Sequence, residues 1–350
     1  MKYINRKLTI ENITVQNIAK KYGTPAYCYS YKQLKTNIYN FKKSFKSFSP
    51  LICFAIKSNT NANLIREIKK LGLGADVVSL GELMLALKAG VNRKKIVFSG
   101  VGKTSNEISY AIDKGILLIN AESENEIKEI NRIAKLKKKK IQIGIRLNPN
   151  TDAKTLKQIS TGKKENKFGV DEKTFLKLIK YCKNSKNIDL KCLSVHIGSQ
   201  ILDYKPYEKM LKIVTNILSK ADHKFEFIDL GGGMGISYNK KNKKLNYQKY
   251  NNSIKKFLKK FKSKIIFEPG RSIIGNTGTL VSRVIYVKKS SKKKFVILDA
   301  AMNDFMRPAL YGASHKILPS VKTKIYTKKD YEFVGPICES TDKFVTLKKF

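Results

Sequence analysis

The sequence of 350 residues predicts an α/β protein in which a (β/α)8 TIM-type barrel is joined to a second, β-rich domain. Short apolar runs alternate with amphipathic stretches of helical period, which is typical of a parallel sheet covered by helices. Eight such units follow one another over about 220 residues, as a (β/α)8 barrel requires. After about residue 273 the alternation stops, and strand-like runs then follow one another without helices between them.

The predicted barrel strands are the apolar or β-branched runs, and the predicted helices are the amphipathic stretches between them. The eight strands are 51–56, 74–79, 95–100, 115–120, 141–148, 192–198, 225–230 and 264–269. The helices include 63–72, 81–90, 124–136, 172–184 and 207–221. An open, doubly wound sheet is the alternative architecture, but it rarely needs eight strand–helix units.

The β-rich domain is predicted from both ends of the chain. Residues 278–302 read as two strands joined by a polar turn, and 324–337 is strand-like as well. The N-terminal stretch "KLTIENITV" (7–15) is also expected to form a strand. We therefore expect the barrel over 25–272 and the β-rich domain over 1–24 plus 273–350.

The formal net charge of +44 raises the question of nucleic-acid binding. The lysines, however, are spread along the whole chain, mostly on predicted helix faces and loops. Only eight of the 71 basic residues are arginine, whose planar fork suits phosphate. We therefore interpret the charge as a compositional bias toward lysine and expect no specific nucleic-acid partner.

The chain has neither the pattern of a membrane span nor that of a secreted protein. No apolar run reaches the roughly 18–20 residues that cross a bilayer, and the first residues lack the continuous apolar core of a signal peptide. The cysteines show no CxxC spacing and are read as reduced thiols (Cys28, Cys53, Cys182, Cys192 and Cys338). These features predict a cytoplasmic protein without membrane contact.

Residue types that carry chemistry fall at the carboxyl ends of the predicted strands. Lys57 follows the first strand and Asp76 lies in the second. His196 ends the sixth strand, the glycine loop "GGGMG" (231–235) follows the seventh, and Glu268 ends the eighth. Function lies at this end in (β/α)8 barrels, so we expect these features to form one site.

Each feature also has an ordinary structural explanation. The glycine loop is then a tight turn, Glu268 a helix N-cap or the ion-pair partner of Arg271, and His196 a packed core residue. No metal site is expected, because His223 and His315 occur in no motif with metal-ligand spacing. Together, however, a lysine, a phosphate-binding loop, an imidazole that packs on a ring and a carboxylate for a ring nitrogen specify pyridoxal 5'-phosphate.

Sequence blocks along nearly the whole chain carry a family resemblance. In order, they include "FAIKSNTN", "GADVVSLGEL", "SVHIGSQ", "DLGGGMGI", "EPGRSIIGNTG", "DAAMNDFMRPALYGASH" and "GPICESTD". They closely resemble the alanine-racemase-like (fold type III) pyridoxal-phosphate decarboxylases, and among these the diaminopimelate decarboxylases. The resemblance implies pyridoxal 5'-phosphate as cofactor and decarboxylation of meso-2,6-diaminopimelate to L-lysine and CO2, the last step of lysine biosynthesis. It also implies a homodimer with shared active sites.

The resemblance further implies a role for each matching residue. Lys57 binds the cofactor as a Schiff base through an amine whose pKa desolvation lowers, His196 stacks on the ring, and Glu268 contacts the pyridine nitrogen. The cofactor phosphate is held by Ser199, Gly232, Gly233, Gly235, Gly270 and Arg271. The substrate carboxylate is bound by Arg271, Arg307 and Tyr311. Cys338 and Glu339 reach into the partner's site, Cys338 as proton donor and Glu339 on the distal ammonium of the substrate.

Three alternatives stay open at the level of sequence. The first alternative function is decarboxylation of a related diamino acid such as carboxynorspermidine. The second alternative is that the chain is a truncated, inactive product that binds the cofactor. The third alternative concerns Cys338, which would then be a small buried residue without a catalytic role. The family continues after "CES" with a "GAYG"-type block, whereas this sequence ends at Phe350, so we expect an incomplete β-rich domain.

Overall fold

A computed structural model describes residues 1–153, 155, 159–238, 244–291, 293–322 and 330–347. The chain forms two compact units. The barrel unit comprises Lys35–Ile236 and Lys243–Gly275, and the β unit comprises Met1–Leu34, Ser237–Asn242 and Asn276–Phe350. No helix among the described residues is long and apolar enough to cross a membrane.

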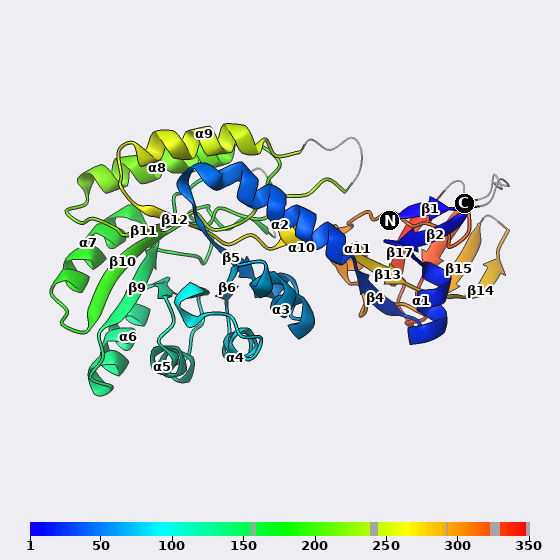
Figure 1. Ribbon diagram of the computed structural model, residues 1–350, viewed down its shortest axis with the longest axis horizontal. Coiled ribbons are helices and arrows are strands. Elements are labelled where there is room, and N and C mark those ends of the chain that lie inside the picture. Colours follow the sequence, from blue (N-terminus) through cyan, green and yellow to red (C-terminus); the bar gives the residue numbers. More distant parts are fainter. Residues whose placement is uncertain (154, 156–158, 239–243, 292, 323–329, 348–350) are drawn as a thin grey trace. The chain divides into compact units, whose positions relative to one another are not determined.

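The barrel unit contains a closed barrel of eight parallel strands (Figure 1). Neighbouring strands pair in chain order, and β12 pairs with β5 to close the barrel. The strands are β5 (Leu51–Ala55), β6 (Gly74–Val77), β7 (Ile96–Phe98), β8 (Leu118–Ala121), β9 (Ile141–Arg146), β10 (Ile188–Ser194), β11 (Phe227–Asp229) and β12 (Lys264–Phe267). This architecture confirms the predicted fold class.

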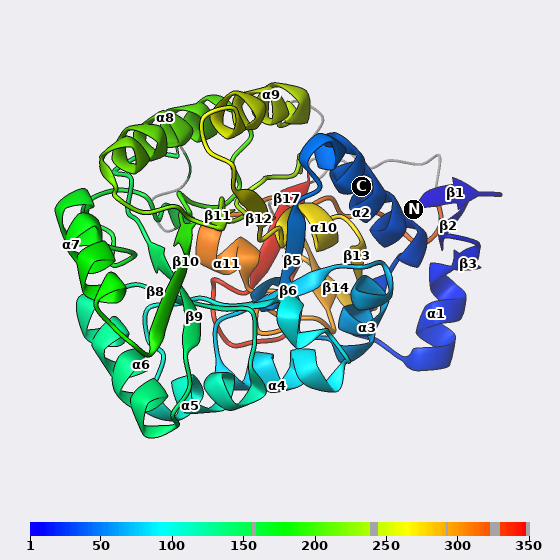
Figure 2. The ribbon, with the colours of Figure 1, turned by 60° about the vertical axis from the view of Figure 1, so that its left-hand side comes forward.

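Helices cover the outside of these strands, as Figure 2 shows for α3 to α9. They are α2 (Tyr31–Phe45, which begins in the β unit), α3 (Ala62–Lys70), α4 (Leu80–Lys88), α5 (Ser105–Lys114), α6 (Glu124–Leu136), α7 (Glu172–Lys183), α8 (Lys205–Lys220), α9 (Tyr247–Leu258) and the short α10 (Arg271–Ile274). Single 3-10 turns occur at η1 (Lys46–Phe48), η2 (Ile56–Ser58) and η3 (Arg93–Lys95).

Polar caps fix where these helices begin, and therefore where the loops at the carboxyl ends of the strands stop. Ser79 and Ser123 accept hydrogen bonds from the first turns of α4 and α6. Thr104 and Glu107 form a reciprocal capping box at the start of α5. Each cap holds a βα loop short and defined, so the side chains that end the strands keep fixed directions.

The interior of the barrel is built in two layers with different chemistry. An apolar cluster collects side chains from six strands: Cys53, Val97, Leu118, Cys192, Phe227 and Ile266. Side chains two residues further along a strand lie on the same face, one layer closer to its carboxyl end. In five of these strands that position is polar and buried: Ser99, Asn120, Ser194, Asp229 and Glu268. The barrel therefore changes from an apolar to a polar interior just below its carboxyl end.

The described residues of the β unit form three small sheets. β1 (Lys2–Ile4), β2 (Lys7–Ile10) and β3 (Ile13–Thr14) form an antiparallel sheet, and β4 (Ala26–Tyr29) pairs with β13 (Gly278–Val281). The third sheet has the order β14 (Val284–Lys289), β15 (Lys294–Leu298), β16 (Tyr331–Val334) and β17 (Lys343–Leu347). Two helices, α1 (Val15–Tyr22) and α11 (Arg307–Tyr311), complete the described part.

Two predictions for the β unit need correction. The stretch 7–15 is not one strand: it forms the hairpin of β2 and β3, and a helix begins at Val15 because the Thr14 side chain accepts a hydrogen bond from Asn17 N. The described residues of the stretch 278–302 form three strands where two were expected. The carboxylate of Asp299 accepts hydrogen bonds from Ser282 Oγ and Arg283 N, which separates β13 from β14.

Candidate active site

Lys57 and Asp76 form an ion pair at the carboxyl end of the barrel. The distance from Lys57 Nζ to Asp76 Oδ2 is 2.7 Å. The Asp76 side chain, on β6, is 0% exposed, whereas that of Lys57, in the turn after β5, is 48% exposed. Asp76 Oδ1 is buried and has no hydrogen-bond partner among the described residues. Lys57 therefore pairs with a buried carboxylate while part of its own side chain is exposed to solvent.

The expected lowering of the Lys57 pKa is wrong. Partial burial lowers the pKa of Lys57, but the charges of Asp76 and Glu268 and the hydrogen bond to Asp76 outweigh it. The net result is a pKa raised above that of an ordinary lysine. Lys57 is thus held as an ammonium, and it becomes a nucleophile only after a proton has left Nζ.

Glu268 and Asp229 form a hydrogen-bonded pair of carboxyl groups in the polar layer. Glu268 Oε1 also accepts from Ser99 Oγ at 3.1 Å. Asp229 Oδ2 accepts from Asn120 Nδ2 at 2.9 Å, across the barrel interior. Burial and mutual repulsion raise the pKa of Glu268 well above its usual range, and burial raises the pKa of Asp229 to about 6.

His196 is held as a neutral imidazole of defined tautomer. Its Nδ1 accepts a hydrogen bond from Gly232 N at 3.1 Å, so the ring proton lies on Nε2. Burial, followed by the positive charges of Arg146 and Lys57, lowers the pKa of His196 well below its usual value. An uncharged ring whose orientation is fixed by the glycine loop suits a packing role more than proton transfer.

The glycine loop after β11 leaves no room for side chains. A Cβ on Gly232 would lie 2.1 Å from the carbonyl oxygen of Glu268, and one on Gly233, where φ is +85°, would lie 2.1 Å from that of Gly198. Gly232 N donates to His196, and Gly235 N donates to the carbonyl of Ile201. The loop is thus a fixed cradle, and the predicted phosphate contacts of its glycines stay a prediction.

A buried tyrosine supports this loop from below. Tyr207, on α8, is fully buried and donates from Oη to the carbonyl oxygen of Gly232 at 3.0 Å. Its ring stacks on that of Tyr250, on α9, with centroids 4.3 Å apart. Contacts from α8 and α9 therefore hold the glycine loop in position at the end of the barrel.

A second buried ion pair stiffens the neighbouring loops. Arg146 Nη1 lies 2.9 Å from Glu122 Oε1, and the same carboxylate accepts from Gly100 N and Gly169 N. Arg146 also packs over the ring of Phe168, 4.8 Å from its centroid. The strand-end Arg146 thus ties the loops after β7, β8 and β9 together.

The other predicted site residues of the barrel unit lie at the same end. Gly270 and Arg271 begin α10 directly after Glu268. A Cβ on Gly270 would lie 3.0 Å from the Ser58 side chain, next to Lys57. Ser199 follows His196 by three residues and donates its backbone N–H to Ile159. The predicted residues Lys57, His196, Ser199, Gly232, Gly233, Gly235, Glu268, Gly270 and Arg271 therefore share one end of one barrel.

The β unit carries an arginine among aromatic rings. The guanidinium carbon of Arg307 lies 5.3 Å from the ring centroid of Tyr238 and 5.6 Å from that of Tyr311. Arg307 Nε donates to His315 Nε2 at 3.4 Å. The His315 ring packs edge-on against Phe305, with centroids 4.6 Å apart. The ring faces and His315 hold the guanidinium in place, as a carboxylate-binding arginine requires.

Cys338 and Glu339 lie in a turn that precedes β17. Cys338 is exposed, so the alternative of a small buried residue is wrong. Glu339 Oε2 accepts from Thr341 Oγ1 at 3.0 Å. Asp342, which is buried, accepts from Met302 N and Ile337 N and so anchors this turn. The turn presents Cys338 and Glu339 from a fixed base.

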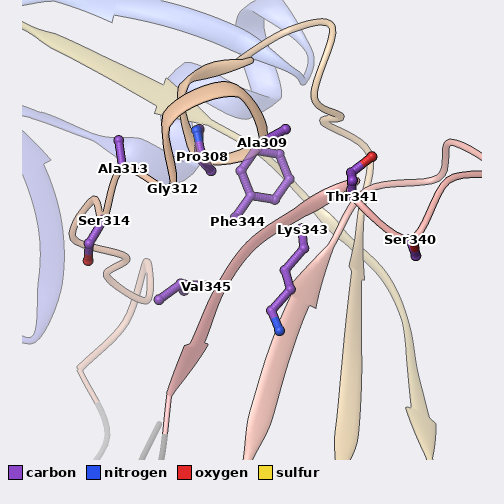
Figure 3. Close-up of a pocket in the computed structure, with 10 residues that line it drawn as sticks. All are labelled: Pro308, Ala309, Gly312, Ala313, Ser314, Ser340, Thr341, Lys343, Phe344 and Val345. Atoms are coloured by element: carbon purple, nitrogen blue, oxygen red, sulfur yellow. The ribbon is translucent and has the colours of Figure 1, made fainter. Parts of the chain in front are cut away.

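A cavity of about 390 Å³ lies between α11 and β17 within the β unit (Figure 3). Its walls come from the segment after Arg307 and from the segment after Glu339. They are Pro308, Ala309, Gly312, Ala313, Ser314, Ser340, Thr341, Lys343, Phe344 and Val345. Among the described residues, no three His, Cys, Asp or Glu side chains gather in a way that could hold a metal ion.

Sequence reasoning assigned no role to four residues that the structure places at the site. They are Ser99, Asn120, Asp229 and Tyr207. The first three carry a signal in the sequence, because each lies two residues after an apolar strand position, at Val97, Leu118 and Phe227. Tyr207 carries none, since a tyrosine on a buried helix face is ordinary core.

Comparisons with known proteins agree with this geometry. The model of a family described as pyridoxal-dependent decarboxylase, pyridoxal binding domain, matches residues 31–275. A diaminopimelate decarboxylase of Aquifex aeolicus is 41% identical over 352 residues, which cover 100% of this chain and 83% of the relative. One of Helicobacter pylori is 42% identical and covers 94% of this chain and 82% of the relative. The crystal structure of diaminopimelate decarboxylase from Helicobacter pylori complexed with L-lysine superposes with a TM-score of 0.90 at 41% identity, covering 95% of this chain and 84% of that one.

Proposed function

We propose that this chain, which belongs to the pyridoxal-dependent decarboxylase family, removes CO2 from meso-2,6-diaminopimelate and forms L-lysine. One observation carries the proposal. The Lys57–Asp76 ion pair and the Glu268–Asp229 pair lie at the carboxyl end of the barrel, and the chain that forms this barrel is 41% identical over its whole length to a diaminopimelate decarboxylase. Such a reaction is the last step of lysine biosynthesis.

The barrel residues fit pyridoxal 5'-phosphate, the cofactor of this family. The buried Oδ1 of Asp76 has no partner among the described residues, and the glycines of the loop carry no Cβ that would stand between its backbone and a ligand. Lys57 offers an amine for the cofactor aldehyde, Glu268 a carboxyl group for the ring nitrogen, and the backbone from the loop and from Gly270–Arg271 a cradle for the phosphate. When bound, the cofactor supplies an electron-accepting ring that takes up the electron pair left by departing CO2.

The barrel side chains then have distinct tasks. Asp76 holds Lys57 in place and is the nearest group that can take a proton from Nζ. Glu268 holds a proton at the ring nitrogen. Neutral His196 packs on the ring without competing for that proton.

We assign substrate recognition to the residues for which the sequence predicted that role. Arg271, Arg307 and Tyr311 bind the carboxylate, for which the fork of an arginine is better suited than an ammonium. Glu339 binds the distal ammonium, and Cys338 donates a proton, both from the partner subunit of a homodimer with shared sites. We further propose a cytoplasmic location, which suits the five free cysteines.

A substrate panel tests the proposal. Purified protein loaded with pyridoxal 5'-phosphate is assayed for CO2 release from meso-diaminopimelate, L-ornithine, L-lysine and carboxynorspermidine. We expect release from meso-diaminopimelate and the appearance of L-lysine. Preferential release from carboxynorspermidine, or no release from any substrate, contradicts the proposal.

A pair of arginine variants tests the recognition step. Arg307→Lys keeps the charge but loses the fork, so KM for meso-diaminopimelate rises by about tenfold or more. Arg283→Lys, at an exposed position of the same unit, is the matched control and leaves KM unchanged. Equal KM values for the two variants contradict the assignment of Arg307.

A further inference from the structure

The hydrogen-bonded acids of the barrel interior hold a proton whose position the structure defines. Two ionised carboxylates only accept hydrogen bonds, so a hydrogen bond between Asp229 and Glu268 requires one proton between them. Asp229 is 0% exposed and Glu268 is buried, so solvent does not take the place of either partner. The pair titrates as a unit, and because the pKa of Glu268 is raised well above its usual range, the pair keeps its last proton to higher pH than an ordinary carboxyl group does.

The neighbours of the pair assign that proton to Glu268. Both oxygens of Asp229 already accept N–H donors, Oδ1 from Gly231 N at 2.9 Å and Oδ2 from Asn120 Nδ2 at 2.9 Å. These donors stabilise an ionised Asp229. Glu268 Oε1 accepts from the Ser99 hydroxyl, and Glu268 donates to Asp229. Glu268 is therefore the protonated member and Asp229 the charged one.

The other titratable groups around the pair leave this assignment unchanged. The Asp76 carboxylate adds negative charge and favours the protonated Glu268, while the Lys57 ammonium acts in the opposite sense and is already paired with Asp76. Burial raises the pKa values of the Cys53 and Cys192 thiols well above their usual range, so both thiols are neutral. Burial does the same to the pKa of Tyr250, whose phenol also stays neutral.

We propose that Asp229 is a positioning residue that keeps one proton on Glu268 until the pyridine nitrogen of the cofactor binds, and that Glu268 then passes this proton to the nitrogen. The O–H bond of Glu268 breaks, and an N–H bond forms with the lone pair of the ring nitrogen. No proton from solvent is needed. The negative charge of Asp229 then stabilises the positive ring, an attraction strengthened by the dry barrel interior.

The inference rests on the cofactor of the proposed function and not on its substrate. Asp229→Asn is nearly isosteric, but its amide donates a hydrogen bond to Glu268. Glu268 in this variant is therefore ionised before the cofactor arrives, and the ring proton must come from solvent. The number of protons taken up on cofactor binding distinguishes the two routes, and it does not depend on decarboxylation.

Calorimetric titration of the cofactor-free full chain with pyridoxal 5'-phosphate measures this number. Titrations are made in buffers of different ionisation heat, at a pH at which the ring nitrogen of the free cofactor carries no proton. We expect Asp229→Asn to take up about one proton more per bound cofactor than the wild type. Asp222→Asn, the same change at a fully exposed position, is the matched control and behaves as the wild type.

Equal proton uptake by Asp229→Asn and the wild type overturns the inference while the cofactor still binds. Absence of cofactor binding by the wild type overturns the proposed function as well, so the two failures are distinguishable.

A second measurement needs no variant. The infrared spectrum of the cofactor-free wild-type protein contains the carbonyl band of a buried protonated carboxyl group, and this band disappears when pyridoxal 5'-phosphate binds. Persistence of the band after binding overturns the proton transfer, even if Asp229→Asn fails to fold.

Discussion

Two lysines at the carboxyl end of the barrel each pair with a carboxylate, yet their surroundings are opposite. Lys57 lies 2.7 Å from Asp76, and Lys103, in the loop after β7, lies 2.6 Å from Glu126. The Lys103 side chain is 1% exposed, against 48% for Lys57. The carbonyl oxygens of Gly100 and Asn120 also accept from Lys103 Nζ, both at 2.7 Å. Burial alone would therefore select the wrong lysine as reactive.

The difference shows that unused bonding capacity marks the reactive lysine. Lys103 has three acceptors for its three donor positions, and it packs over the ring of Phe98, so its ammonium is fixed. Lys57 has one acceptor in Asp76, whose other oxygen has no partner among the described residues, and its chain reaches solvent. The first arrangement stabilises loops, and the second leaves an amine that a ligand can approach.

The largest effect is expected for Lys57→Ala. Loss of the amine removes the covalent link to the cofactor, so decarboxylation falls on the order of a thousandfold or more and the absorbance of the bound cofactor changes. The variant also leaves the buried Asp76 carboxylate without its ion-pair partner, so the cofactor-free protein unfolds at a lower temperature than the wild type. Lys70→Ala, at an exposed helix position, is the control. An unchanged cofactor spectrum in Lys57→Ala would remove Lys57 from the site.

Lys103→Ala gives the opposite result. Removing one partner of a buried ion pair leaves the Glu126 charge without its cation, and the Gly100 and Asn120 carbonyl groups lose the donor that Lys103 supplies, so the free energy of unfolding falls by about 3–5 kcal/mol. Where the variant still folds, its bound cofactor has the wild-type absorbance. Denaturant unfolding and an absorbance spectrum check both statements. A stable Lys103→Ala protein with an altered cofactor spectrum would exchange the roles of the two lysines.

Asp76→Asn tests the effect of the Asp76 charge on the pKa of Lys57. Because the Asp76 charge raises the pKa of Lys57, its removal lowers this pKa, and the amine becomes neutral at lower pH. The rate at which the cofactor-free protein condenses with pyridoxal, followed by absorbance, therefore reaches its maximum at a lower pH than in the wild type. Decarboxylation falls by about a hundredfold, since the proton acceptor is lost. A profile that moves to higher pH contradicts this assignment.

Glu126→Gln is the matched change at the other pair and has the smallest effect. The amide oxygen still accepts from Lys103, but the amide NH2 replaces the oxygen that accepts from Glu122 N, so the free energy of unfolding falls by about 1–3 kcal/mol. The pH profile of condensation with pyridoxal is unchanged. A shift of that profile as large as that in Asp76→Asn would show that the two pairs are not independent.

Much of the fold could be predicted because strand and helix periods are local properties. Each of the eight predicted strand ranges overlaps one barrel strand, and 124–136 coincides with α6. The start of β10 at Ile188 precedes the predicted 192, since the polar Asp189 and Lys191 interrupt the apolar run. The stretches 7–15 and 278–302 were predicted incorrectly because the ends of their short strands depend on hydrogen bonds that the side chains of Thr14 and Asp299 accept.

The candidate site was predictable wherever an unusual residue type ends a strand. Lys57, His196 and Glu268 are such residues, and they lie at one end of the barrel. The Lys57 pKa was predicted in the wrong direction because the direction of its shift depends on two charged residues distant in the sequence. They are Asp76, 19 residues away, and Glu268, which directly follows β12. Coulomb energies depend on distance in space, which the sequence does not contain.

The sequence by itself determined the order of strands and helices, the end of the barrel that carries chemistry, and the lysine that ends its first strand. Those properties follow from hydrophobic period and chain connectivity. Only the tertiary structure decided which lysine is fully bonded, which nitrogen of His196 carries the proton, and that Asp229 and Glu268 share one. These depend on partners brought together across the barrel from strands far apart in the chain, because a hydrogen bond requires contact within about 3 Å.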